Sequence, residues 1–137
     1  MMIIAFALPL LLAGLMIADG DDADDTAAAQ EGTPGEDTLT GTQGNELLRG
    51  NGGDDLLVGL DGHDTLFGNA GDDALIGGDG DDMLCAGIGD DVVTGSRGED
   101  TIEGQGGNDW VSGDYSNDSV YGNEGDDTVL GLSLIHI

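Results

Sequence analysis

Carboxylate side chains recur every nine residues along most of the chain. Eleven nine-residue units follow one another, the first starting at Gly32 and the last at Gly122, and position 6 of each unit is aspartate except at Glu46. A carboxylate can act as an acid or base, or it can bind a hard metal ion. Catalysis of the glycosidase type needs one pair of acids. A carboxylate repeated at one spacing therefore favours a series of metal sites.

The overall charge of the chain favours the binding of cations. The formal net charge is −27, with only Arg49 and Arg97 in opposition. If strands stack at roughly 4.8 Å, acidic residues such as Asp55 and Asp73 lie close enough to repel each other. Calcium would remove that repulsion, since it takes about six to eight oxygen ligands from carboxylates and carbonyls. The same charge disfavours nucleic acid as a partner.

Position 5 is also rich in oxygen-bearing side chains. We expect these side chains to add oxygen ligands for calcium in the loops. They are Asp54, Asp72, Asp81, Asp90 and Asp126, with Asn45, Asn108 and Asn117.

The elements that must position these acids follow from the other constrained positions. Position 8 is Leu, Val or Ile in every unit, which predicts a short strand at positions 7 to 9 with position 8 facing inward. Position 1 is glycine except at Ala86, and position 4 is glycine except at Ser116. Such glycines suit the chain reversal expected at positions 1 to 6. A fixed short period of this kind is typical of a solenoid.

The repeat resembles the calcium-binding nonapeptide of the RTX family, Gly-Gly-x-Gly-x-Asp-x-(large apolar)-x, over residues 32–130. The resemblance implies an all-β fold, a parallel β-roll (β-solenoid) with two nonapeptides per coil and calcium between stacked loops. It also implies that position 6 binds the metal. The expected ligands are Asp37, Asp55, Asp73, Asp91, Asp109 and Asp127 in one column, and Asp64, Asp82, Asp100 and Asp118 in the other, which Glu46 begins.

Two inner rows of apolar side chains should then form the core. One row is Leu39, Leu57, Leu75, Val93, Val111 and Val129, and the facing row is Leu48, Leu66, Leu84, Ile102 and Val120. Composition alone favours an acidic, glycine-rich disordered tract. The strict apolar position 8 argues for a folded roll when calcium is present, so we expect metal binding and folding to be coupled.

Other site chemistries fit poorly. An EF-hand loop starting at Asp79 would lack the glutamate at its position 12. Zinc requires clustered cysteine and histidine, whereas Cys85 is the only cysteine and His63 stands alone at a position 5. No serine, cysteine or histidine lies in a recognisable nucleophile motif. We therefore expect no enzyme activity and no catalytic residue in the repeat.

The two ends of the chain differ from the repeat. Residues 1–18 are almost wholly apolar, which predicts a signal peptide or a membrane anchor helix. Residues 19–31 read as an acidic linker, and the β-roll is expected over 32–131. Residues 132–137 break the pattern. Their codons can match the end of a transposon adaptor, which suggests an adaptor-derived scar, although a real apolar strand capping the last coil is the alternative.

These features together predict an extracytoplasmic module, secreted or anchored at the cell surface, that folds on calcium and acts in structure or binding. The alternative is the auxiliary region of a secreted enzyme of protease or lipase type, with its catalytic domain outside this sequence. Calcium ions are the expected partners, with a membrane tether through residues 1–18. Apolar outward residues from Leu56 to Ile76 also suggest self-association through one sheet.

Overall fold

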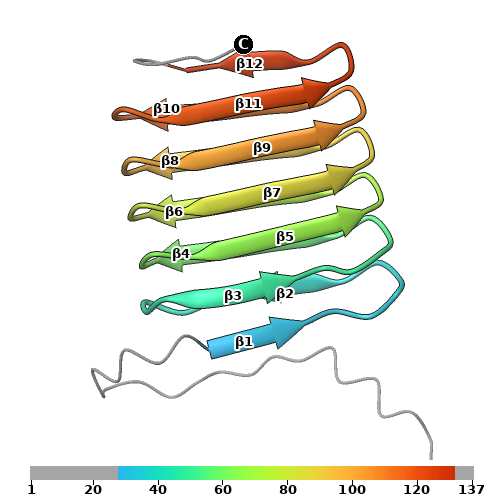
Figure 1. Cartoon of the computed structure of the whole chain (residues 1–137). Coiled ribbons are helices and arrows are strands. Elements are labelled where there is room, and N and C mark those ends of the chain that lie inside the picture. The colour runs from blue at the N-terminus through green and yellow to red at the C-terminus, as the bar shows by residue number, and fades with distance from the viewer. Residues whose placement is uncertain (1–27, 132–137) are drawn as a thin grey trace, which may run out of the picture.

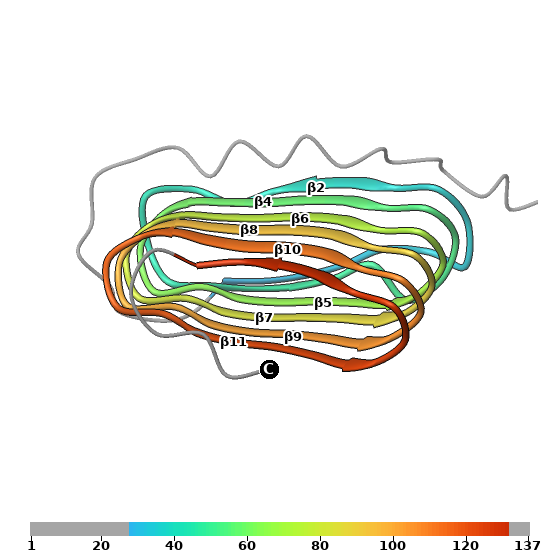
Figure 2. The ribbon, with the colours of Figure 1, turned by 90° about the horizontal axis from the view of Figure 1, so that it is seen from above.

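The computed structural model describes residues 28–131, so the expected N-terminal helix, the first part of the linker and the C-terminal hexapeptide lie outside it. The described chain winds into a parallel β-solenoid of about six turns, with two six-stranded sheets facing each other (Figures 1 and 2). Within residues 28–131, no helix is long and apolar enough to cross a bilayer.

The strands alternate between the two sheets along the chain. Sheet A contains β1 (Ala28–Glu31), β3 (Glu46–Arg49), β5 (Thr65–Ala70), β7 (Met83–Ile88), β9 (Thr101–Gly106) and β11 (Ser119–Glu124). Sheet B contains β2 (Thr38–Thr40), β4 (Leu56–Asp61), β6 (Ala74–Asp79), β8 (Val92–Arg97), β10 (Trp110–Tyr115) and β12 (Thr128–Leu130). Each pairing joins residues eighteen positions apart, as in Leu57 with Leu75, so two units make one coil as expected.

The core between the sheets consists of the position-8 side chains and of Ala86, which stands at a position 1. The position-8 side chains from Leu48 to Val120 are fully buried, while Leu39 and Val129 at the two ends of the stack are half-buried. Both predicted inner rows are confirmed by the strand register. Each buried Leu or Val contributes roughly 1.5–3 kcal/mol relative to an exposed one. One apolar row per sheet is therefore enough to hold neighbouring coils together.

The strands are longer than the sequence predicted. Central strands such as β5 span six residues, from position 7 through position 3 of the next unit, so the chain reverses only at positions 4 to 6. Phe67 pairs with Cys85 just before position 1, which is Gly68 in one strand and Ala86 in the other, and Asn69 pairs with Gly87 just after it. Each segment stacks on its own equivalent one coil away, so its backbone can pair whatever its side chains are. The spacing of the apolar residues therefore predicts strands that are shorter than those in the structure.

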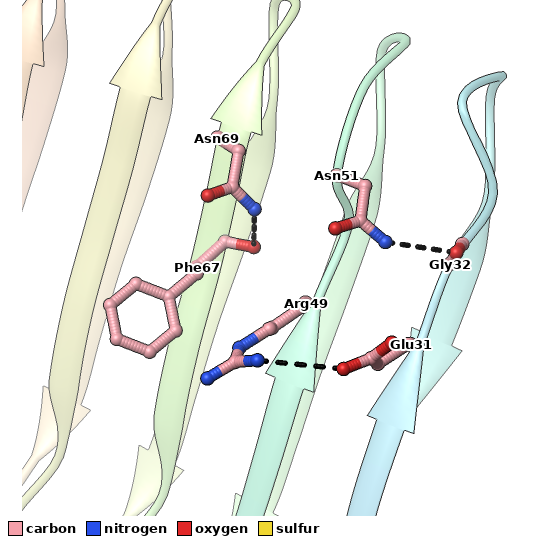
Figure 3. Close-up of polar contacts among 6 residues, drawn as sticks. All are labelled: Glu31, Gly32, Arg49, Asn51, Phe67 and Asn69. Carbon is pink, nitrogen blue, oxygen red and sulfur yellow. Dashed lines mark hydrogen bonds and ion pairs between the residues drawn. The ribbon is translucent and has the colours of Figure 1, made fainter.

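Strand β1 lies in residues that the sequence analysis placed in the linker. Ala28–Glu31 pairs in parallel with β3, so the last four residues of that predicted linker belong to sheet A. Arg49 contacts Glu31 at 3.4 Å and lies 5.7 Å from the centre of the Phe67 ring (Figure 3). The side chain of Asn51 also donates a hydrogen bond to the Gly32 carbonyl. The Arg49–Glu31 contact ties β1, which lacks the repeat motif, to β3 in the next coil.

Candidate metal centre

The position-6 carboxylates lie where each loop enters its strand. Asp55 precedes β4 in sheet B, and Asp64 precedes β5 in sheet A, so alternate units place their acids at opposite ends of the oval cross-section (Figure 2). The result is the two columns predicted from the sequence. The central acids are buried, with 2% of the surface of Asp73 and 3% of that of Asp82 exposed, for example.

One oxygen of each carboxylate holds the neighbouring coil. Oδ1 of Asp73 accepts the backbone N–H of Asp55 at 2.8 Å, and Oδ1 of Asp91 accepts that of Asp73 at 2.7 Å. The second column repeats this, with the N–H of Asp64 donating to Oδ1 of Asp82 at 2.8 Å. Each aspartate therefore bonds to the coil before it through its side chain and to the coil after it through its backbone.

The other oxygen, Oδ2, is buried and has no hydrogen-bond partner in eight of these aspartates. A buried acceptor without a partner costs about 1–3 kcal/mol, and more when it is charged. This cost recurs in every inner unit at the same atom, and binding of a cation at that atom would remove it. The eight residues are Asp55, Asp64, Asp73, Asp82, Asp91, Asp100, Asp109 and Asp118.

Burial also raises the pKa of these carboxyl groups. Desolvation lifts the pKa of Asp82 to about 7, against the lowering effect of the Asp64 backbone N–H, and the charges of Asp100 and Asp64 raise it further. The same causes raise the pKa of Asp73 and of Asp91 to about 6. A buried carboxyl group with a raised pKa is more stable when it carries a proton or binds a cation than as a free carboxylate anion.

Backbone oxygens lie beside the unpartnered carboxylate oxygens. A Cβ added at Gly59 would collide with Oδ2 of Asp64 and with the carbonyl oxygen of Gly77, and the same pair of atoms, Asp73 Oδ2 and the Ala86 carbonyl, crowds Gly68. Glycine at position 1 therefore lets the carboxylate fold back over the start of its own loop. A side chain there would fill a space lined by a carboxylate and a carbonyl.

This oxygen set fits calcium. Within residues 28–131, no three or more His, Cys, Asp or Glu side chains gather as a metal site. The donors beside each Oδ2 atom are carbonyl oxygens such as that of Gly77. A hard divalent cation accepts such mixed carboxylate and carbonyl ligands, whereas structural zinc requires clustered cysteine and histidine.

Comparison with known families agrees with the geometry. The model of the RTX calcium-binding nonapeptide repeat matches residues 31–66, 49–84, 58–93, 86–114 and 103–133, which together cover most of the chain. The chain belongs to this RTX repeat family. No curated protein matches it. Membership gives the RTX roll its coarse function, a calcium-binding structural module.

Position 5 of the RTX roll has a role that the sequence analysis did not predict. Oδ1 of Asp72 accepts the backbone N–H of Asp90 at 2.9 Å, and Asn108 does the same for Asp126 at 3.1 Å. His63 replaces the oxygen with Nδ1, which accepts the N–H of Asp81 at 2.9 Å. These side chains bond to the next coil, whereas position-6 side chains bond to the previous one. Asparagine, aspartate and histidine at position 5 all make this bond, as Asn45, Asp54 and His63 show.

The outermost position-6 carboxylates differ from the eight inner ones. Asp37 and Glu46 accept hydrogen bonds from threonines at position 2 of their own units, Thr33 and Thr42. Asp127 is half-buried in the last coil, with Oδ1 bonded to the Asp109 N–H. The threonine contacts were missed from the sequence. The available signal was that position 2 is threonine only in these two units.

Proposed function

We propose that this chain is an extracytoplasmic RTX module whose roll folds around calcium bound at the position-6 aspartates. The inner aspartates of both columns supply a carboxylate oxygen, and backbone carbonyls near the position-1 glycines complete each site. The expected role is structural or adhesive. We do not propose catalysis, because the polar residues described in the roll stand at repeated positions and make contacts that hold its loops together.

The observation that carries the proposal is the Oδ2 atom left without a partner in eight buried aspartates. In a chain of net charge −27, these atoms make the compact state unfavourable unless cations neutralise them. Calcium therefore acts as part of the core, and its binding free energy contributes directly to folding.

Two features support a location outside the cytoplasm, the proposed calcium requirement and the N-terminal sequence. Extracellular calcium modules bind with dissociation constants of roughly 10⁻⁴–10⁻³ M, which only calcium-rich compartments can saturate. The apolar residues 1–18 would direct the chain to the membrane and tether it or be removed. Protease digestion of intact cells making the full chain checks this, since a cytoplasmic module would remain protected.

A calcium titration of the full chain, followed by circular dichroism, tests the function. We expect low β-sheet signal in chelator and a cooperative gain near millimolar calcium, because each coil folds against its neighbour. Magnesium at the same concentration should be less effective, because it prefers a smaller octahedral shell with bound waters. An unchanged β signal between chelator and millimolar calcium would rule out calcium-coupled folding.

A further inference from the structure

The first two units satisfy their carboxylates without a metal. The backbone N–H and the hydroxyl of Thr33 donate to Oδ2 of Asp37, at 2.5 and 2.8 Å. Thr42 does the same for Glu46, with its N–H on Oε2 and its hydroxyl on Oε1, both at 2.7 Å. In the inner units the corresponding Oδ2 atom has no donor. The oxygen available to a cation elsewhere is thus already occupied here.

The backbone of these two loops is also different. Positions 2 and 4 have positive φ in all nine units from Gly50 to Gly122, for example 79° at Asn51 and 97° at Gly53. Thr33, Thr42 and the glycines at position 4 of their units do not. A β-branched residue strongly disfavours positive φ, so threonine at position 2 selects the other loop conformation. That conformation turns its N–H toward the carboxylate of its own unit.

We propose that the residue at position 2 decides whether an RTX loop of this chain binds calcium, and that Thr33 and Thr42 make the first two units a calcium-independent end of the roll. A hydrogen-bond donor and a cation compete for the same carboxylate oxygen. The donor removes the cost of an unpartnered oxygen, so these loops gain nothing from the ion. This inference rests on calcium binding by the inner units.

Calcium stoichiometry of the full chain at saturating calcium, measured by equilibrium dialysis, tests the inference. The double variant Asp37→Asn/Glu46→Gln should bind as many ions as the wild type. The matched variant Asp73→Asn/Asp82→Asn, one change in each column, should lose at least two. Equal losses in the two variants would overturn the inference. A wild type that binds no calcium would instead overturn the proposed function.

A gain of binding provides the second test. Thr42→Asn/Glu46→Asp converts the second unit to the pattern of the unit at Gly50. We expect it to bind about one ion more than the wild type, because asparagine accepts positive φ and the shorter acid loses its donors. The control Glu46→Asp alone keeps Thr42, whose β-branched side chain disfavours positive φ, and should show no gain. Unchanged stoichiometry in the asparagine variant would contradict the role of position 2.

Discussion

The backbone N–H of Asp73 donates to Oδ1 of Asp91, one coil further along the chain, at 2.7 Å. Between the same two coils, the N–H of Asp90 donates to Oδ1 of Asp72 at 2.9 Å. Two adjacent acids therefore exchange hydrogen bonds with the equivalent pair in the next coil. This reciprocal arrangement recurs between successive loops, so a loop is fully bonded only when both neighbours are folded. Cooperative folding follows directly.

Substitution in the middle of a column should be more damaging than at its N-terminal end. Asp73→Ala removes the acceptor of the Asp55 N–H as well as a carboxylate beside two coils. Asp37 has no described coil before it in its column, and its Oδ2 bonds to Thr33. We expect Asp73→Ala and Asp91→Ala to raise the calcium midpoint several-fold, and Asp37→Ala to change it little. Circular dichroism titrations measure this, and equal shifts would argue against stacked columns.

Leu60 is held in a backbone conformation that suits glycine. Its φ is 91°, at a position 2 where other units have Asn69 or Gly78, and its side chain is 42% exposed. A left-handed conformation costs a residue with a Cβ about 1–2 kcal/mol. We expect Leu60→Gly to stabilise the calcium-loaded roll by about 1 kcal/mol, because the strain it relieves exceeds the added backbone entropy.

Urea unfolding at saturating calcium measures the effect of Leu60→Gly. Leu56→Gly provides the matched control, since Leu56 is similarly exposed, at 37%, but is not among the residues with positive φ. This control should destabilise the roll by about 1 kcal/mol, the cost of glycine in a regular strand. The prediction fails if both variants change stability in the same direction.

Acidification should favour the calcium-free roll. Burial raises the folded-state pKa of Asp82 from 3.8 to about 7, so the folded chain binds more protons than the unfolded chain between these pH values. Stability is therefore greatest below about pH 4 and is lost as the pH rises toward 7. Calcium-stripped protein should gain β-sheet signal between pH 8 and pH 4. Asp82→Asn should weaken this dependence. A β-sheet signal that does not change with pH would contradict a raised pKa of the buried aspartates in the folded state.

Calcium binding should respond to pH in the opposite direction. Protons compete with the ion for the same carboxylates, so the calcium midpoint should rise as the pH falls from 8 to 5. Titrations at several pH values with one buffer ionic strength measure this shift. A midpoint that falls on acidification would mean that these carboxylates are not the ligands.

The outer face of sheet B should mediate self-association once calcium is bound. Leu56 and Ile76 are 37% and 39% exposed on the paired strands β4 and β6, next to Val58. Positions 7 and 9 of sheet B carry no charged residue, whereas those of sheet A include Arg49 and Glu103. Light scattering of the calcium-loaded chain should show an oligomer that Val58→Lys and Ile76→Lys abolish. A wild type that stays monomeric at high concentration would exclude this role.

The resemblance to the RTX repeat predicted the parallel roll with two units per coil, and the residues at positions 8 and 6 then predicted the two inner rows and the two columns of acids. The sequence could not show that strands continue past position 9, because that pairing is made by backbone atoms alone. It also did not show that position-5 side chains such as Asp72 accept backbone hydrogen bonds from the next coil, since an aspartate suits that role as well as metal binding. Strand β1 has no repeat motif and was missed for that reason.

Partners eighteen residues apart make the roll tolerant of some changes in gene length and sensitive to others. Loss or duplication of eighteen residues would leave every later strand in its own sheet. A change of nine would keep position 8 in the core but exchange the two outer faces of all later coils. The row from Val58 through Ile76 and Thr94 to Ser112 would then be interrupted by side chains such as Glu103. An insertion or deletion of any whole number of nine-residue units therefore keeps the two columns of acids. Only a change by an even number of units also keeps the same side chains on the outer face of each sheet.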